Sequence, residues 1–313
     1  MKKITLIIAL MIVFGNTLYS QSSRSLPFLE LNADTRTAGM GDANMGATKS
    51  MYLYTNPTAF FLNEDKIYTS YTFGMLPKVN DSRQLYHAVS AGYKFLNRHV
   101  AMVGFRYFSG LEVPRIDENG VPGKPIHPMD WAIDFAYAFQ FNPNLSAFIG
   151  GNFIQSYNYK TAYTGGVSTG IYYNNSFALS NQEANYMVGL SIHDLGGKVK
   201  YGKKGTETNM PASVGVGGSL SLHLAENHKL NAGLTTRTFF LPSDAKAFTG
   251  GLGVEYELFD VAALRTGYHW GNDNGYFTVG LGGSIKFVRV DLAYSIAKMK
   301  EYNFLRLGVS VQL

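Results

Sequence analysis

From Lys66 to Leu313 the chain is a succession of segments in which large apolar side chains alternate with small or polar ones. The clearest example is the stretch WAIDFAYAFQF, residues 131–141. A period of two is the pattern of a β-strand, because successive side chains point to opposite faces. One face of this stretch carries only large apolar side chains, namely Trp131, Ile133, Phe135, Tyr137, Phe139 and Phe141. Such a face is typical of a strand against lipid, whereas a soluble sandwich packs its inner face on a sheet of limited extent.

The alternation predicts fourteen strands, each long enough to cross a bilayer at a tilt, which takes about 9–11 residues. We place them at residues 66–76, 84–95, 98–108, 129–140, 145–155, 163–173, 184–193, 210–223, 228–238, 247–257, 260–269, 275–286, 288–296 and 303–313. The sequence therefore predicts an all-β protein, a fourteen-stranded antiparallel transmembrane β-barrel over residues 66–313.

The breaks between these strands support the barrel. Short breaks follow the second, fourth, eighth, tenth and twelfth strands, and longer ones follow the first, third, seventh and ninth; the longest is Ser109–Pro128. Outer-membrane barrels have short periplasmic turns and longer external loops. The break at residues 174–183 does not follow this order. The last predicted strand reaches Leu313, as expected if it pairs with the first strand and closes the barrel.

Composition agrees with a membrane barrel. Only 16% of residues are charged and 14% are aromatic, whereas soluble domains carry about 25% charged residues. The mean hydropathy of −0.06 argues against a bundle of transmembrane helices. The chain has no cysteine, which excludes disulfides, a thiol nucleophile and a cysteine-ligated metal. The formal net charge is +5, but the sequence has no basic patch dense enough to bind nucleic acid. We therefore expect no nucleic-acid partner.

Residues 1–20 have the form of a signal peptide. Lys2 and Lys3 precede a short apolar run, and polar residues follow it. The run is shorter than the roughly 20 apolar residues of a transmembrane helix. We therefore expect cleavage after Ser20 and export to the cell outer membrane.

Residues 21–65 lack sustained alternation but are rich in apolar side chains, including Leu29, Met45 and Phe60. A polar segment of this length would stay disordered, whereas an apolar one packs on something. The lumen of the barrel, or its periplasmic mouth, is the space in which this segment can pack. We expect residues 21–65 to form an N-terminal plug.

The polar faces of the last five strands carry charges of both signs. These candidate lumen residues are Glu255, Glu257, Arg265, Arg289, Asp291 and Arg306. Buried charges must be paired, so the main interpretation is an ion-pair lining that holds the wall and docks the plug. Asp34 and Arg36 in the plug are the expected partners. The alternative is a polar path for a ligand.

The chain offers little for catalysis. The stretch GVSTG, residues 166–170, fits the G-x-S-x-G pattern of hydrolases, but it lies inside a predicted strand and no helix follows. The glycines of GMGDANMG lack the following Lys of a phosphate loop. The seven histidines show no metal-ligand spacing. We expect no catalytic residue, no metal and no cofactor.

The N-terminal residues resemble those of PorV-like (PorV/PorQ) proteins of the type IX secretion system, within the wider FadL-like group of fourteen-stranded barrels. The resemblance lies in LPFLELNADTRTAGMGDANMGA and TNPTAFF, and it resumes at residues 209–220 and 251–287. Matching residues are Phe28, Leu29, Asp34, Arg36, Gly39, Met40, Gly41, Asp42, Ala43, Asn56 and Pro57. Thr58 stands where the family usually has alanine.

This resemblance implies an outer-membrane protein that binds exported proteins through their C-terminal signal domains and shuttles them to surface attachment. Its partners would be that cargo, the secretion translocon, the attachment complex and outer-membrane lipid. The alternative implied by FadL-like relatives is transport of hydrophobic small molecules across the outer membrane. A third class, an outer-membrane enzyme, requires the serine pattern to be real. The long break at residues 109–128 and the lysine-rich stretch at 196–209 are candidate surfaces for a protein partner.

Overall fold

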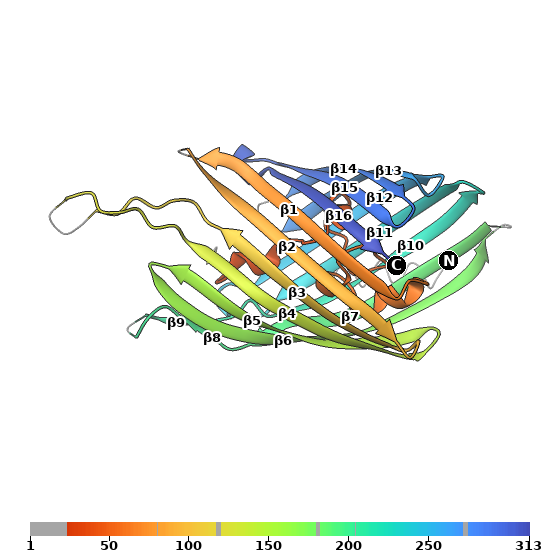
Figure 1. Ribbon diagram of the computed structural model, residues 1–313, viewed down its shortest axis with the longest axis horizontal. Helices are drawn as coiled ribbons and strands as arrows, with labels where there is room; N and C mark the ends of the chain where they lie inside the picture. Colours follow the sequence, from red (N-terminus) through yellow and green to blue (C-terminus); the bar gives the residue numbers. More distant parts are fainter. Residues whose placement is uncertain (1–23, 80, 117–119, 180–181, 204, 272–274) are drawn as a thin grey trace.

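The computed structural model describes residues 24–313, except residues 80, 117–119, 180–181, 204 and 272–274. Fourteen antiparallel strands form a closed barrel, with the N-terminal segment inside it (Figure 1). The strands are β1 (Ile67–Val79), β2 (Ser82–Phe95), β3 (His99–Ser109), β4 (Met129–Asn142), β5 (Leu145–Asn158), β6 (Lys160–Leu179), β7 (Gln182–Gly196), β10 (Ser213–Ala225), β11 (His228–Phe239), β12 (Ala247–Leu258), β13 (Ala262–Gly271), β14 (Tyr276–Ile285), β15 (Val288–Ala297) and β16 (Phe304–Gln312). The predicted fold is confirmed.

The barrel closes where β1 pairs with β16. The register runs from Tyr68 opposite Gln312 to Met75 opposite Leu305. The backbone of Leu313 continues the seam, since its N–H donates to the carbonyl oxygen of Ile67 at 2.9 Å. Every strand of the barrel therefore has two neighbours, and no edge is left to pair with another chain.

Alternation along β4 separates the two faces as the sequence predicts. Ile133 and Phe135 are 46% and 57% exposed on the outside, whereas Ala132 and Asp134 are 0% and 5% exposed in the lumen. Large apolar side chains form the outer face of the other strands as well. Among the residues that the structure describes, no helix is long and apolar enough to cross a membrane.

Several strand ends differ from the predicted ones. The predicted break at 174–183 was wrong, because β6 extends through Asn174 and Asn175, which pair with Met187 and Tyr186 of β7. The predicted longer break after the first strand was also wrong, since β1 and β2 continue to Val79 and from Ser82. Polar residues read as turns are strand residues here, because a neighbouring strand supplies their hydrogen bonds.

The long connections all lie at one end of the barrel, although this end also has the one-residue connection at residue 159 between β5 and β6. At the opposite end the described connections are all short, at residues 96–98, 143–144, 226–227, 259–261 and 286–287. At the end with the long connections, residues 110–116 and 120–128 form an arm that projects beyond the strands (Figure 1). This end also carries a hairpin of β8 (Lys198–Lys200) and β9 (Glu207–Asn209), which the sequence did not predict. The short end is the periplasmic one by the rule for outer-membrane barrels.

Residues 24–65 contain no barrel strand and pack in the lumen, where Figure 1 draws them in red and orange. Their short helices are η1 (Pro27–Glu30), α2 (Thr35–Ala38), η2 (Tyr52–Tyr54) and η3 (Pro57–Leu62). Phe60 and Tyr52 lie 4.8–5.1 Å from the ring of Tyr68 on β1. We keep the plug–barrel division at residue 65 as a proposal. The expected signal peptide lies outside the described residues.

If the outer surface faces lipid, the cost of a charged substitution should depend on its depth in the bilayer, and a single strand can test this. Leu281 lies midway along β14 and Ile285 ends it, and both are exposed. We expect Leu281→Arg to lower the free energy of unfolding by about 2–4 kcal/mol, and Ile285→Arg by about 0–1 kcal/mol. Urea titration of the barrel in phospholipid vesicles measures both. Equal losses at the two positions would contradict a membrane-embedded β14.

Candidate functional site

The candidate site is the contact between the plug and the wall formed by β12 to β16. Glu255 and Glu257 are two residues apart on β12, so both point into the lumen. Arg265 lies opposite Glu255 on the neighbouring β13. Arg289 and Asp291 occupy the same face of β15. All five side chains are buried.

Glu255 is the centre of this cluster and is 0% exposed. Its two oxygens accept from Arg36 of the plug, with Nη2–Oε1 at 2.6 Å and Nε–Oε2 at 3.0 Å. Arg265 Nε donates to Oε2 at 2.5 Å, and Asn231 Nδ2 donates to Oε1 at 2.9 Å. A bidentate arginine–carboxylate pair is a strong, directional contact. The plug is therefore tied to the wall at a buried point.

Further ion pairs extend from this centre. Asp291 lies 2.8 Å from Arg265 Nη2 and 3.1 Å from Arg289 Nε. Lys49 of the plug lies 2.6 Å from Glu257. Two plug cations thus contact two wall carboxylates, and the wall arginines hold those carboxylates in place. The expected use of Arg36 as a plug partner agrees with this geometry.

Arg306 does not join the cluster in which the sequence placed it. It is buried on the lumen face of β16, but its guanidinium lies 3.9 Å from the ring centroid of Phe304 and Nη1 donates to Ser295 Oγ at 3.2 Å. Among the described residues it has no carboxylate within ion-pair distance. The alternation along β16 correctly predicted that Arg306 faces the lumen, but β13 to β15 lie between β16 and the strand that carries Glu255.

Asp34 has a different role from the expected one. It caps the N-terminus of α2 by accepting from the backbone N–H of Thr37 at 3.1 Å. Its carboxylate also accepts from the hydroxyls of Thr37, Thr48 and Ser50. Asp34 therefore holds the plug together and does not contact the wall charges, because an N-cap carboxylate faces the start of its own helix.

The other residues of the plug motif shape its backbone. Asn56 caps η3 through its side-chain oxygen, which accepts from Thr58 N–H at 3.1 Å, and Pro57 begins that helix. Gly39 approaches Gly280 of β14. Gly41 has φ +67°, and a Cβ there would lie 2.6 Å from backbone oxygens of Leu252 and Tyr268.

The wall glycines facing this turn were missed in the sequence. A Cβ on Gly251 would lie 1.8 Å from the Gly41 oxygen, and one on Gly253 or Gly267 would lie 2.3 Å from Met40 atoms. These glycines let the plug backbone pack directly on the backbone of β12 and β13. Their signal was the run TGGLG in a strand, where an interior glycine marks a close approach.

The charge state of Arg36 supports a permanent ionic contact between the plug and the wall. Burial opposes the charged form of Arg36, but the Glu255 carboxylate outweighs it and raises the pKa of the guanidinium above its ordinary value. Burial lowers the pKa of the Lys49 ammonium, an effect that Glu257 opposes. Burial raises the pKa of the Tyr52 hydroxyl to about 12, so this buried phenol stays neutral.

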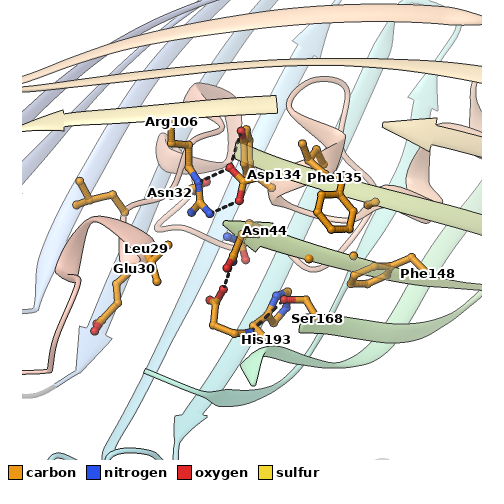
Figure 2. A pocket seen from close by; sticks show the side chains of 18 of the residues that line it. Leu29, Glu30, Asn32, Asn44, Arg106, Asp134, Phe135, Phe148, Ser168 and His193 are labelled. Atoms are coloured by element: carbon orange, nitrogen blue, oxygen red, sulfur yellow. Dashed lines mark hydrogen bonds and ion pairs between the residues drawn. The ribbon is translucent and has the colours of Figure 1, made fainter. Parts of the chain in front are cut away.

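A second polar cluster lines a lumen cavity of about 80 Å³ between the plug and β3–β7. Arg106 Nε donates to Asp134 at 3.1 Å, as Figure 2 shows, and Tyr54 of the plug donates to the same carboxylate at 3.1 Å. The Arg106 guanidinium also lies 4.9 Å from the Tyr54 ring. This cluster ties the plug to the opposite wall.

The GVSTG serine lies in β6, in agreement with the predicted strand. Ser168 lines the lumen cavity together with His193 and Asp194, a neighbourhood that the sequence did not reveal. Ser168 Oγ, however, accepts from the backbone N–H of Asp194 at 3.1 Å, and His193 Nε2 bonds Ser191 at 2.8 Å. The strand–elbow–helix setting of a hydrolase serine is not formed.

Comparison with known proteins identifies the family. Residues 20–246, more than half of the chain, match the family described as type IX secretion system protein PorV. The chain belongs to the PorV family. The predicted family is confirmed, and with it an outer-membrane location and a secretion or transport class of barrel. The match ends before β12, so it includes Arg36 and Lys49 of the plug but not the β12 carboxylates that they contact, nor the charged residues of β13 and β15. No curated protein matches the chain.

Solved structures show the same fold. The Pseudomonas putida toluene transporter TodX has a TM-score of 0.60 and 13% identity over 90% of this chain and 98% of that one. The Ralstonia pickettii toluene transporter TbuX has a TM-score of 0.59 and 13% identity over the same shares. The PorV-family chain is therefore similar to these barrels in architecture, at an identity too low to transfer an activity.

Removing the central carboxylate tests the plug contact. We expect Glu255→Ala to lower the free energy of unfolding by about 3–5 kcal/mol, because it leaves Arg36 buried without its carboxylate partner and leaves Arg265 with Asp291 alone. Asp260→Ala, which breaks a rim pair with Lys229, should lower it by at most about 1 kcal/mol. Urea titration measures both variants, and equal effects would contradict a lock at Glu255.

The cap at Asp34 makes a separate prediction about the plug. We expect Asp34→Ala to lower the free energy of unfolding by about 1–3 kcal/mol, because several buried donors lose their acceptor. Asp34→Asn, which keeps one acceptor oxygen, should lose less. Thermal unfolding followed by the gel mobility of unheated and heated samples measures the effect. An Asp34→Ala protein with unchanged heat stability would refute this role.

Proposed function

We propose that this PorV-family barrel binds the C-terminal signal domains of exported proteins and shuttles them to the surface attachment complex. Its work is recognition and transfer, without catalysis. The observation that carries the proposal is the arm at residues 110–116 and 120–128, which exposes the apolar side chains of Val113, Ile116 and Val121 on the end of the barrel opposite the short turns. Membership of the PorV family supports a role in type IX secretion, and the arm supports binding through an exposed surface.

The arm is an extended ribbon with exposed apolar side chains. Val113 and Ile126 bond each other through both backbone N–H groups at 2.9 Å, and Gly123 N–H donates to Arg115 oxygen at 2.8 Å. Val113 and Ile116 are 45% and 67% exposed. Apolar side chains displayed away from the membrane-spanning strands are typical of a protein-binding surface. A β-rich signal domain is a suitable partner for such a ribbon, since extended segments pair through their backbones.

The lumen favours this function over transport. The plug is tied to β12 by Arg36 and Lys49 and to β4 by Tyr54. Of the lumen cavities that the described residues line, one measures about 80 Å³ and another, toward the short-turn end, about 340 Å³. Transport requires a path past these contacts, whereas binding at the arm requires no movement of the plug.

The second candidate is transport of hydrophobic small molecules. The fold shared with the toluene transporters TodX and TbuX is the observation that favours it. In this candidate the plug contacts open to release a path through the lumen. A barrel that purifies with bound fatty acid or another hydrophobic compound, and with no protein, would support it.

The test is a pull-down of the tagged barrel from detergent-solubilised outer membranes of its own host. We expect exported proteins that share a C-terminal β-domain to co-purify, and the double variant Val113→Asp/Ile116→Asp to reduce them about tenfold or more. The matched control is Val261→Asp, an exposed valine in a turn at the other end. Cargo recovered equally with the arm variant would overturn the proposal.

A further inference from the structure

A groove of about 560 Å³ lies on the outer wall of the barrel across β4 to β7. Its apolar lining includes Phe135, Tyr137, Ile149, Val167 and Leu195. All of these side chains are exposed, and no charged residue lines the groove. It shares Phe135, Gly150, Gly151 and Asn152 with the lining of the lumen cavity on the other side of the wall, and it is separate from the arm.

Two glycines at outward positions create the hollow. Gly151 of β5 stands between Phe135 of β4 and Val167 of β6, and Gly165 of β6 stands opposite Phe153 of β5. The neighbouring outward positions on these strands carry large side chains, such as Ile149 and Tyr163. The hollow is therefore an interruption in an otherwise bulky apolar surface.

The backbone holds this shape from the lumen side. The pairing of β6 with β7 shifts register between Val167 and Thr169, and Asp194 on β7 has φ 54°. Asn152 fixes the irregular region, since its Nδ2 donates to Asp194 Oδ1 at 2.8 Å and its Oδ1 accepts from Gly166 N–H at 2.9 Å. A site shaped in advance in this way loses little order on binding.

We propose that this groove binds one acyl chain of an outer-membrane lipid and retains it longer than the surrounding bilayer lipid. The groove is continuous with the lipid-facing band, in which Phe153 and Ile171 are also exposed. A hollow left empty loses dispersion contacts along its lining, and a flexible hydrocarbon chain can fill it. The strands beneath are paired on both sides, so a partner strand finds no free backbone edge there.

The test uses phosphatidylethanolamine vesicles that contain phosphatidylethanolamine with a photoactivatable diazirine acyl chain. After irradiation, mass spectrometry of peptides locates the labelled residues. We expect labelling at Ile149, Val167 and Leu195 to exceed that at the outward residues Leu264, Val279 and Leu281 about fivefold. Uniform labelling around the barrel, as for bulk lipid, would overturn the proposal.

Filling the groove supplies the matched variants. A Cβ on Gly151 lies 2.9 Å from the far end of the Phe135 ring, which can turn aside, and 3.3 Å from the Gly166 oxygen, so we expect Gly151→Leu to fold. A Cβ on Gly165 would lie 2.6 Å from the Asn152 backbone oxygen. Gly151→Leu should reduce groove labelling to the level of the reference strands. Gly283→Leu, at an outward glycine of β14 with open space, should leave it unchanged.

A second filling variant, Val167→Trp, keeps the test decisive if Gly151→Leu does not form a barrel, as judged by gel mobility of unheated and heated samples. Groove labelling that survives a folded filling variant would overturn the proposal. So would crosslinking of groove residues to a protein in native outer membranes, which would assign the surface to a protein partner. Neither outcome depends on cargo binding at the arm.

Discussion

The structure depends on one buried carboxylate. Glu255 is fully enclosed and accepts from Arg36 of the plug and Arg265 of the wall at the same time. A buried ion pair gains little over a well-packed apolar contact, but removing one partner leaves an unpaired charge at a large cost. The arrangement therefore specifies one position for the plug. A barrel lumen, which is polar by nature, is a place where such a lock can form.

Close backbone packing accompanies the lock. The turn at Met40 and Gly41 lies on Gly251, Gly253 and Gly267, where any side chain would collide with plug backbone. The ion pairs orient the plug, and the glycines let its backbone approach the wall closely. Together they hold a segment that has only short helices of its own. The plug fills much of the lumen, and the surfaces that we propose for partners are the arm outside and the lipid-facing wall.

The outward side chains of the barrel wall are not uniformly large. On β4 to β7, Gly151 and Gly165 interrupt a face of aromatic and branched side chains, and Asn152 holds the backbone around them from within. The same strands carry Arg106 and Asp134 inside, which tie the plug through Tyr54. Because successive side chains point to opposite faces, the same strands present an apolar surface outside and dock the plug inside.

The sequence by itself determined the barrel, its fourteen strands and the face of each lumen charge, because alternation is a local property read directly from residue order. It also predicted Arg36 as a plug partner for the wall. It did not separate Arg306 from the cluster, predict that Asp34 bonds donors of the plug instead of the wall charges, or find the wall glycines, because these depend on distances between strands and on the path of the plug. Strand ends such as Asn174 likewise became strand only through the neighbour that pairs with them. Only the tertiary structure decided which of the charged residues on the lumen faces form ion pairs.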